Sequence, residues 1–349
     1  MDQILFIGTL ALIIFFAIWW GFRSLPKEHW QFMAVLPRQK TAHGKWKGLN
    51  LTYYGLLCAN AYTFAVIIFF ILATSVYMPM KGLCVIIITL LAVCLPASKL
   101  VARAVEKKQG TLTVGGAVFV GTLVAPWLVT LVNNTMGKTL SFHINVTVLL
   151  SCICIAYAFG EGLGRLACVS FGCCYGKPLN QCSPFTQSLF SKFYMIFSGS
   201  TKKISYASGF QDQKVLPIQI ITAVVYSLCG LVCTALFLNQ FFITALLISL
   251  FVTQAWRFFS EFLRADFRGS FKITPYQIMS ALTIFYAAGV VVLFPAGSET
   301  PDLSTGLNAL WNPWIILMIQ SIWVASFIHT GRSVVTDAEI SFGVVKHKI

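Results

Sequence analysis

Charged residues are scarce in this chain, and acidic residues are the scarcest. Only 10% of the 349 residues are Asp, Glu, Lys or Arg, just 11 of these are acidic, and 57% of the chain is hydrophobic. Soluble globular domains contain about 25% charged residues. With a mean hydropathy of +0.79, the composition excludes an ordinary soluble fold and predicts a polytopic integral membrane protein of the all-α class.

The beginning of the chain lacks the features of a cleavable signal peptide. Asp2 stands where a signal peptide carries basic residues, and the first apolar run ends in Trp19 and Trp20 instead of small residues. We therefore expect this run to remain as a membrane anchor.

Long runs without charge divide the chain into about nine expected spans, each close to the roughly 20 residues that a transmembrane helix needs. The expected spans are 4–21, 53–77, 83–100, 112–132, 146–163, 217–238, 241–259, 276–294 and 314–329.

These spans suggest three parts of the chain. Residues 1–48 are expected to form an extra anchor helix and a basic, amphipathic interfacial segment, 49–295 a membrane core, and 296–349 an extra helix with a basic tail. The long connection 175–216 breaks the membrane pattern, and we expect it to form a small interfacial cap.

The basic residues are distributed unevenly between the two sides of these spans. Connections on one side contain 23 of the 25 Lys and Arg residues, and the other side contains Lys81 and Lys138. Because Lys and Arg accumulate in cytoplasmic connections, we expect the N-terminus outside and the C-terminus inside. The net charge of +14 then indicates contact with anionic lipid headgroups, not with nucleic acid.

The 11 cysteines lack the pattern of a secreted disulfide framework. Seven lie within expected spans, where thiols pack as small hydrophobic groups: Cys58, Cys84, Cys94, Cys152, Cys154, Cys229 and Cys233. Cys168, Cys173, Cys174 and Cys182 follow the fifth span on the predicted cytosolic side, where thiols stay reduced. Their spacing, C-x4-C-C-x7-C, lacks the C-x2-C pair of zinc knuckles, so we expect neither a metal nor a cofactor.

Ionisable residues at the ends of membrane spans are costly to bury and indicate function. Glu161 and Arg165 lie four residues apart, as do Arg257 and Glu261, with Arg264 three residues further on. Each set shares one helix face, so we expect Glu161 to pair with Arg165, and two arginines to flank Glu261. Guanidinium groups together form a phosphate clamp; the alternative is that they snorkel and only anchor the helix ends.

Five motifs, collinear over about 50–295, resemble those of the bacterial prolipoprotein diacylglyceryl transferases. They are 51–56 (LTYYGL), 110–116 (GTLTVGG), 164–176 (GRLACVSFGCCYG), 216–219 (LPIQ) and 257–264 (RFFSEFLR). The resemblance implies an inner-membrane pocket in which Arg165 and Arg257 hold the headgroup of phosphatidylglycerol. It implies transfer of a diacylglyceryl unit to a lipoprotein cysteine, with further substrate-binding residues at Tyr54, Gly115, Gly116, Glu161, Gln219 and Arg264.

The sequence differs from the family motifs at four positions. Val114 and Leu216 stand where the family has histidine, and Cys168 and Cys173 where it has Asn and an acidic residue. The family also works on the outer face, whereas the charge distribution predicts a cytosolic site. Because guanidinium groups favour the nucleophilic thiolate, the expected catalytic residues are Cys168, Cys173 and Cys174, together with Glu261. Packing of these thiols in a tight turn is the competing interpretation.

The sequence therefore predicts a membrane transferase that moves an acyl, diacylglyceryl or headgroup unit of a glycerophospholipid. Its expected partners are the phospholipid substrate, the bilayer and an acceptor, either a lipid or a protein thiol. Two alternatives remain: a true prolipoprotein diacylglyceryl transferase, and a non-catalytic lipid-binding or transport protein, which the missing histidines favour.

Single cysteines placed at Ser198 and Ser304, in a variant without other accessible thiols, test the predicted orientation on intact cells. Ser304 lies in an outer connection and should react with an impermeant thiol reagent, whereas Ser198 lies in the connection 175–216 and should not. The reverse labelling pattern would place the site on the outer face.

Overall fold

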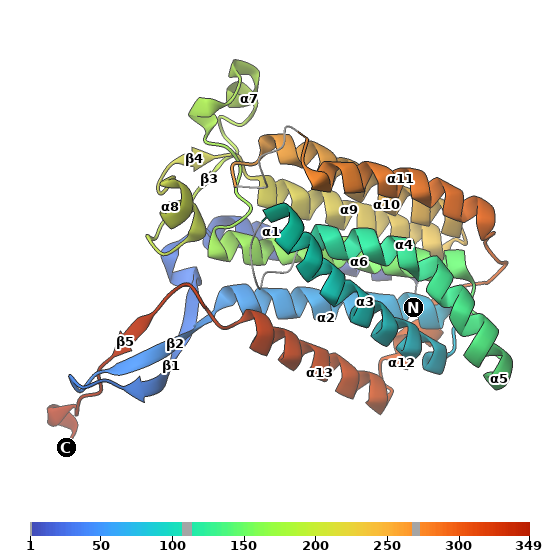
Figure 1. Cartoon of the computed structure of the whole chain (residues 1–349), viewed down its shortest axis with the longest axis horizontal. Coiled ribbons are helices and arrows are strands. Elements are labelled where there is room, and N and C mark those ends of the chain that lie inside the picture. The colour runs from blue at the N-terminus through green and yellow to red at the C-terminus, as the bar shows by residue number, and fades with distance from the viewer. Residues whose placement is uncertain (1, 107–113, 267–272) are drawn as a thin grey trace.

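A computed structural model of the chain describes residues 2–106, 114–266 and 273–349, in which long helices run side by side in one bundle (Figure 1). Within these ranges, nine helices are long and apolar enough to cross a membrane, which confirms the predicted class. They are α1 (Gln3–Ser24), α2 (Tyr53–Ser75), α3 (Met80–Glu106), α4 (Val114–Val132), α6 (Val146–Phe171), α9 (Ile218–Leu238), α10 (Phe242–Ser260), α11 (Pro275–Leu293) and α13 (Pro313–Thr330). Residues 110–113, which begin the motif at 110–116 and include the first two residues of the fourth expected span, lie outside the described residues.

Local sequence signals fix where several helices begin. The Asn145 side chain caps α6 by accepting a hydrogen bond from the backbone of Val148. Thr274 and Gln277 form a reciprocal capping box at the start of α11, with proline at its first position. These caps satisfy backbone groups that neither lipid nor a neighbouring helix turn would satisfy.

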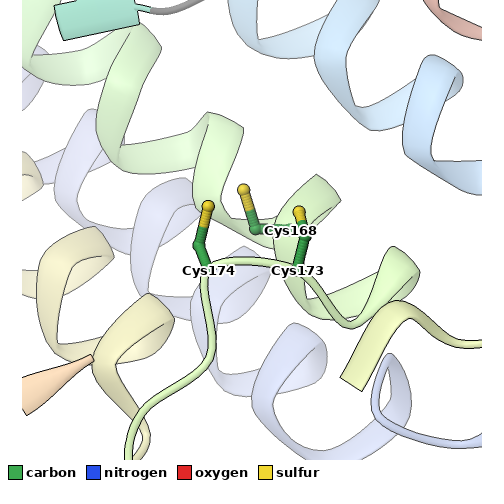
Figure 2. A group of neighbouring side chains, drawn as sticks. All are labelled: Cys168, Cys173 and Cys174. Atoms are coloured by element: carbon green, nitrogen blue, oxygen red, sulfur yellow. The ribbon is translucent and has the colours of Figure 1, made fainter. Parts of the chain in front are cut away.

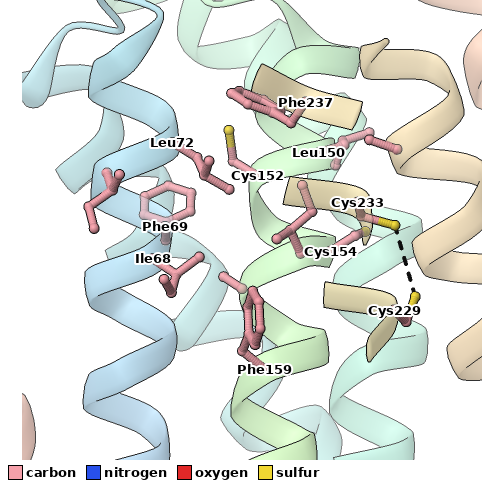
Figure 3. Packing of buried hydrophobic residues seen from close by; sticks show 14 of the residues in the cluster. Ile68, Phe69, Leu72, Leu150, Cys152, Cys154, Phe159, Cys229, Cys233 and Phe237 are labelled. Atoms are coloured by element: carbon pink, nitrogen blue, oxygen red, sulfur yellow. Dashed lines mark hydrogen bonds between the residues drawn. The ribbon is translucent and has the colours of Figure 1, made fainter. Parts of the chain in front are cut away.

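The central helix of the bundle is α6. In its apolar window 78% of residues are buried, against 6% in α13, and it packs against α2, α9 and α10. Figure 3 shows Phe69 and Leu72 of α2 facing Cys152 on one side of α6, while Cys154 faces α9. Arg165 therefore lies on the most buried helix of the bundle, and Arg257 lies on α10, which packs directly against it.

The cysteines within the spans follow the packing prediction for the most part. Five are buried, whereas Cys84 and Cys94 are partly exposed, and all are free thiols. The sulfurs of Cys229 and Cys233 lie 3.9 Å apart, one turn apart on α9 (Figure 3).

The segment between α1 and α2 differs from the expected amphipathic stretch. It forms an antiparallel hairpin of β1 (Phe32–Lys40) and β2 (Trp46–Thr52), and β5 (Ala338–Ile340) of the C-terminal tail pairs with the other edge of β2. The short β5 strand supplies too little local signal for the sequence to predict this pairing. The two flanking parts of the chain therefore meet in one sheet.

The connection 175–216 packs over the same end of the bundle as this sheet (Figure 1). At its base Lys202 is fully buried, and its Nζ donates hydrogen bonds to the carbonyls of Leu25 (3.1 Å) and Ser170 (2.5 Å). Burial lowers the pKa of Lys202 to about 8. The contacts tie this connection to the ends of α1 and α6. Its elements are α7 (Pro184–Leu189), β3 (Met195–Ile196), α8 (Lys203–Ser208) and β4 (Lys214–Val215).

The far end of the bundle carries the short helices α5 (Lys138–Leu140) and α12 (Leu303–Ala309) (Figure 1). The basic connections 21–52, 164–216 and 330–349 thus gather at the end with the sheet. That grouping agrees with the charge pattern, and the direction of this end relative to the cytosol stays a prediction.

Candidate active site

A cavity of about 580 Å³ lies at the end of the bundle that carries the sheet. Helices α2, α4, α6 and α10 contribute to its wall, as do α8 and the segment after α13. Ten of the twelve predicted site residues line it: Tyr54, Gly115, Glu161, Arg165, Cys168, Cys173, Cys174, Arg257, Glu261 and Arg264. Gly116 and Gln219 do not.

Glu161 is the shared partner of two arginines. Its Oε1 accepts hydrogen bonds from Arg165 on α6 and from Arg257 Nη2 on α10, the latter at 3.3 Å. All three side chains are largely buried, with 9% of Glu161, 14% of Arg165 and 12% of Arg257 exposed. The expected Glu161–Arg165 pair is confirmed. Tyr157 also accepts a hydrogen bond from Arg257 Nη2, at 3.1 Å.

The expectation that Arg257 and Arg264 both flank Glu261 was wrong in part. Because α10 ends at Ser260, Glu261 lies in a 3-10 turn and Arg264 is already extended. Arg264 makes two hydrogen bonds to Asp266, at 2.8 and 2.9 Å, and a looser contact of 3.9 Å to Glu261. Burial alone would lower the pKa of Arg264, but the charge of Asp266 raises it well above the ordinary value.

Two buried polar atoms in this cavity have no hydrogen-bond partner among the described residues. They are Arg165 Nε and Glu261 Oε2. Buried polar groups are nearly always paired in folded proteins, so an orphaned donor and acceptor in one cavity point to a polar ligand.

Two basic residues missed in the sequence, Lys203 and Arg332, also line the cavity. Neither forms a salt bridge within the described parts of the chain. Arg332 reaches the cavity because the tail folds back onto α2: Gly331 accepts a hydrogen bond from the backbone of Thr52 at 2.9 Å, and an added Cβ on Gly55 would lie 2.1 Å from Gly331. No local sequence signal indicates this return of the chain.

The cavity carries a net positive charge. It contains five basic residues, Arg165, Lys203, Arg257, Arg264 and Arg332, against three acidic ones, Glu161, Glu261 and Asp266. The excess of two positive charges favours an anionic ligand.

Three thiols converge in the same cavity. The Sγ atoms of Cys168, Cys173 and Cys174 lie within 4.8 Å of one another, and Figure 2 shows the side chains projecting in a common direction. The end of α6 causes this. Gly172 is left-handed (φ +72), and Cys173 N donates to Cys168 O at 3.0 Å, so the chain folds back on the helix.

The turn after α6 is held firmly. Cys174 also has a positive φ of 56, an uncommon conformation for a residue with a side chain. The buried Gln219 donates from Nε2 to Cys173 O at 2.9 Å, so it positions the turn instead of lining the cavity as predicted. Hydrogen bonds with Cys168 and Cys174, together with burial, raise the pKa of the Cys173 thiol well above its ordinary value. The expectation that nearby guanidinium groups favour the thiolate is therefore wrong for Cys173. Cys182 is not part of this cluster.

The paired glycines of α4 have different roles. A Cβ on Gly115 would lie 2.6 Å from Arg257 Nη1 and 2.8 Å from Tyr276, so Gly115 leaves room for the guanidinium group. A Cβ on Gly116 would lie 2.6 Å from Val101 on α3, so Gly116 serves helix packing.

A family model described as prolipoprotein diacylglyceryl transferase matches residues 44–293, which is more than two thirds of the chain. A search of curated proteins found no match. The matched range contains the ten predicted residues that line the cavity, and Arg332 lies beyond it.

Gly115→Ala should lower phospholipid turnover by purified protein by roughly 10- to 100-fold, because a methyl group there displaces the Arg257 guanidinium, and misplacement by about 1 Å is that costly. The thermal unfolding midpoint should fall modestly, because the end of the Arg257 side chain can move aside but the buried Tyr276 ring must also shift. Gly289→Ala on α11, where nothing lies within 4 Å of the added Cβ, is the matched control. Equal turnover in the two variants would contradict this role.

Proposed function

Because the chain belongs to the prolipoprotein diacylglyceryl transferase family, we propose that it transfers the diacylglyceryl unit of phosphatidylglycerol, or of a similar anionic glycerophospholipid, to an acceptor thiol. Members of the family are lipid-modifying transferases, and this chain is an integral membrane protein. The proposed location is a bacterial inner membrane, with the cavity on the cytosolic side as the charge distribution predicts.

The observation that carries this proposal is the arrangement of Arg165 and Arg257 around one carboxylate. Glu161 neutralises one of the two guanidinium charges, and Arg165 Nε remains an unpaired donor inside the cavity. A phosphate diester entering there meets a partly desolvated positive pair from two adjacent helices. Charge-assisted bonds of this kind are strong and directional.

This geometry supports displacement at the glyceryl carbon. The sulfur of the acceptor thiolate attacks that carbon, a C–S bond forms, and the bond from carbon to the phosphate oxygen breaks. The glycerophosphate headgroup leaves with the electron pair, and the thiol proton passes to solvent. Arg165 and Arg257 stabilise the negative charge that develops on the leaving phosphate.

A second candidate reaction is acyl transfer, which the three thiols in the cavity favour. Cys174 Sγ would attack an ester carbonyl of the lipid, the lysophospholipid would leave as an alkoxide and take up a proton, and an acyl thioester would remain. An acceptor nucleophile then takes the acyl group. A diacylglyceryl thioether on Cys174 would be too stable to pass on, so a covalent intermediate implies acyl transfer.

Arg165→Lys and Arg257→Lys should each lower phosphatidylglycerol turnover by about 100- to 1,000-fold, because lysine keeps the charge but loses the planar fork. Turnover in vesicles and retention of lipid during purification are the measurements. Arg23→Lys is the matched control, since Arg23 contacts the Trp19 ring and does not line the cavity.

Normal turnover in both lysine variants would return the two arginines to an anchoring role. Retained lipid binding without turnover, even in the wild-type chain, would instead favour the lipid-binding or transport alternative.

Cys174→Ser separates the two candidate reactions. If Cys174 carries an acyl thioester, intact-protein mass spectrometry after mixing with phospholipid should show an acyl adduct that this variant loses together with turnover. Cys182→Ser should behave as the wild type does, because Cys182 lies outside the thiol cluster. Normal turnover by Cys173→Ser, Cys174→Ser and the double variant would exclude covalent catalysis at this pair.

A further inference from the structure

The three thiols of the cavity have the separations that a metal ion requires. Thiolate sulfurs bind Zn²⁺ at about 2.3 Å, which places neighbouring sulfurs about 3.8 Å apart in a tetrahedral arrangement. The Sγ atoms of Cys168, Cys173 and Cys174 already lie within 4.8 Å of one another and project in a common direction (Figure 2). Small rotations of the side chains would bring all three onto one ion.

The backbone around these thiols is fixed before any ion binds. Cys173 N donates to Cys168 O at 3.0 Å, and Gln219 holds Cys173 O at 2.9 Å. On the other side of Cys174, Tyr175 O accepts a hydrogen bond from Ala265 N at 3.1 Å. Such outer contacts orient metal ligands and lower the cost of assembling a site.

The charge around the cluster also suits a thiolate site. One Zn²⁺ with three thiolates carries a net charge of −1. Arg165, Lys203 and Arg264 line the same cavity, and Lys203 has no salt bridge within the described ranges. This surplus of positive charge favours an anionic metal complex.

We propose that Cys168, Cys173 and Cys174 form a three-thiolate Zn²⁺ site whose fourth position opens into the cavity. Thiolates select Zn²⁺ over Mg²⁺ and Ca²⁺. Three protein ligands with one open position are the pattern of catalytic zinc sites, whereas structural sites have four protein ligands. Cys182, the fourth cysteine of this region, does not join the cluster and leaves that position open.

The role of this site rests on the proposed function. An acceptor thiol that binds at the fourth position loses its proton to solvent, because a thiol that coordinates a metal ion is deprotonated. Its sulfur then attacks the glyceryl carbon held beside Arg165 and Arg257. The ion would thus supply thiol activation in a chain that has Val114 and Leu216 where the family motifs have histidine.

The binding test uses the full chain, reduced and purified in detergent without added lipid. One equivalent of Co²⁺ should produce a thiolate-to-metal charge-transfer band, and Zn²⁺ should displace it. Loss of a residue that only supports a metal ligand can weaken metal binding by roughly 100-fold. Loss of a ligand itself should cost at least as much, so Zn²⁺ binding should weaken by at least that factor in each of Cys168→Ser, Cys173→Ser and Cys174→Ser. Cys182→Ser is the matched control and should bind as the wild type does.

A second measurement does not depend on the folding of variants. Bound Zn²⁺ should protect Cys168, Cys173 and Cys174 of the wild-type chain from alkylation, while the rate at Cys182 stays unchanged. Absence of the charge-transfer band, or equal alkylation of the three thiols with and without Zn²⁺, would overturn the site.

Failure of the proposed function can be told apart from failure of the site. Arg257→Lys should lower lipid turnover by about 100- to 1,000-fold and keep wild-type Zn²⁺ affinity, since Arg257 is not a ligand. Removal of Zn²⁺ by a chelator should lower turnover, and re-addition should restore it. Zn²⁺ binding with turnover that chelation leaves unchanged would overturn the catalytic role of the ion.

Discussion

Pairing of buried charge is the constraint on which this structure depends. Glu161 is the one carboxylate of α6, the most buried helix of the bundle, and an unpaired charge at that depth would be costly. It pairs with Arg165 one turn later on α6 and with Arg257 of α10. The second pair sets the position of α10 along the axis of α6. Gly115 leaves room for the Arg257 guanidinium, and Tyr157 accepts a hydrogen bond from it. The arrangement that stabilises the bundle therefore also directs positive charge into the cavity.

The end of α6 links this charged pair to the thiols. Its left-handed Gly172 turns the chain back, and the following residues bond to the segment after α10, where Lys177 N donates to Leu263 O at 3.0 Å. Cys173 and Cys174 thus lie between the ends of the two arginine-bearing helices. Because these contacts connect the turn after α6 with the segment after α10, a shift of either helix would change the positions of both the guanidinium groups and the sulfurs.

The features that could be predicted from the sequence are those that depend on local composition and on the spacing of nearby residues. Apolar runs located the spans, and spacing of four residues located the Glu161–Arg165 pair. Contacts between distant segments were not predictable: Arg257 pairs with Glu161 because α10 packs against α6. Arg332 reaches the cavity just before the tail strand β5, which pairs with β2. The convergence of the thiols was also not predictable from spacing along the chain, because it is the left-handed turn at Gly172 after α6 that brings Cys173 and Cys174 beside Cys168.

The residues that line the cavity come from the part of the chain that matches the family and from the C-terminal tail. The matched residues 44–293 supply the paired arginines and the thiols, whereas the tail supplies Arg332. Arg165, Arg257 and Arg264 all have carboxylate partners, so an incoming anion must share them with Glu161 or Asp266. Arg332 and Lys203 form no salt bridge in the described parts of the chain and can contribute their full charge. Because Arg332 is positioned by the return of the tail onto α2, we expect the strength of anion binding to depend on the sheet that joins the two flanks of the chain.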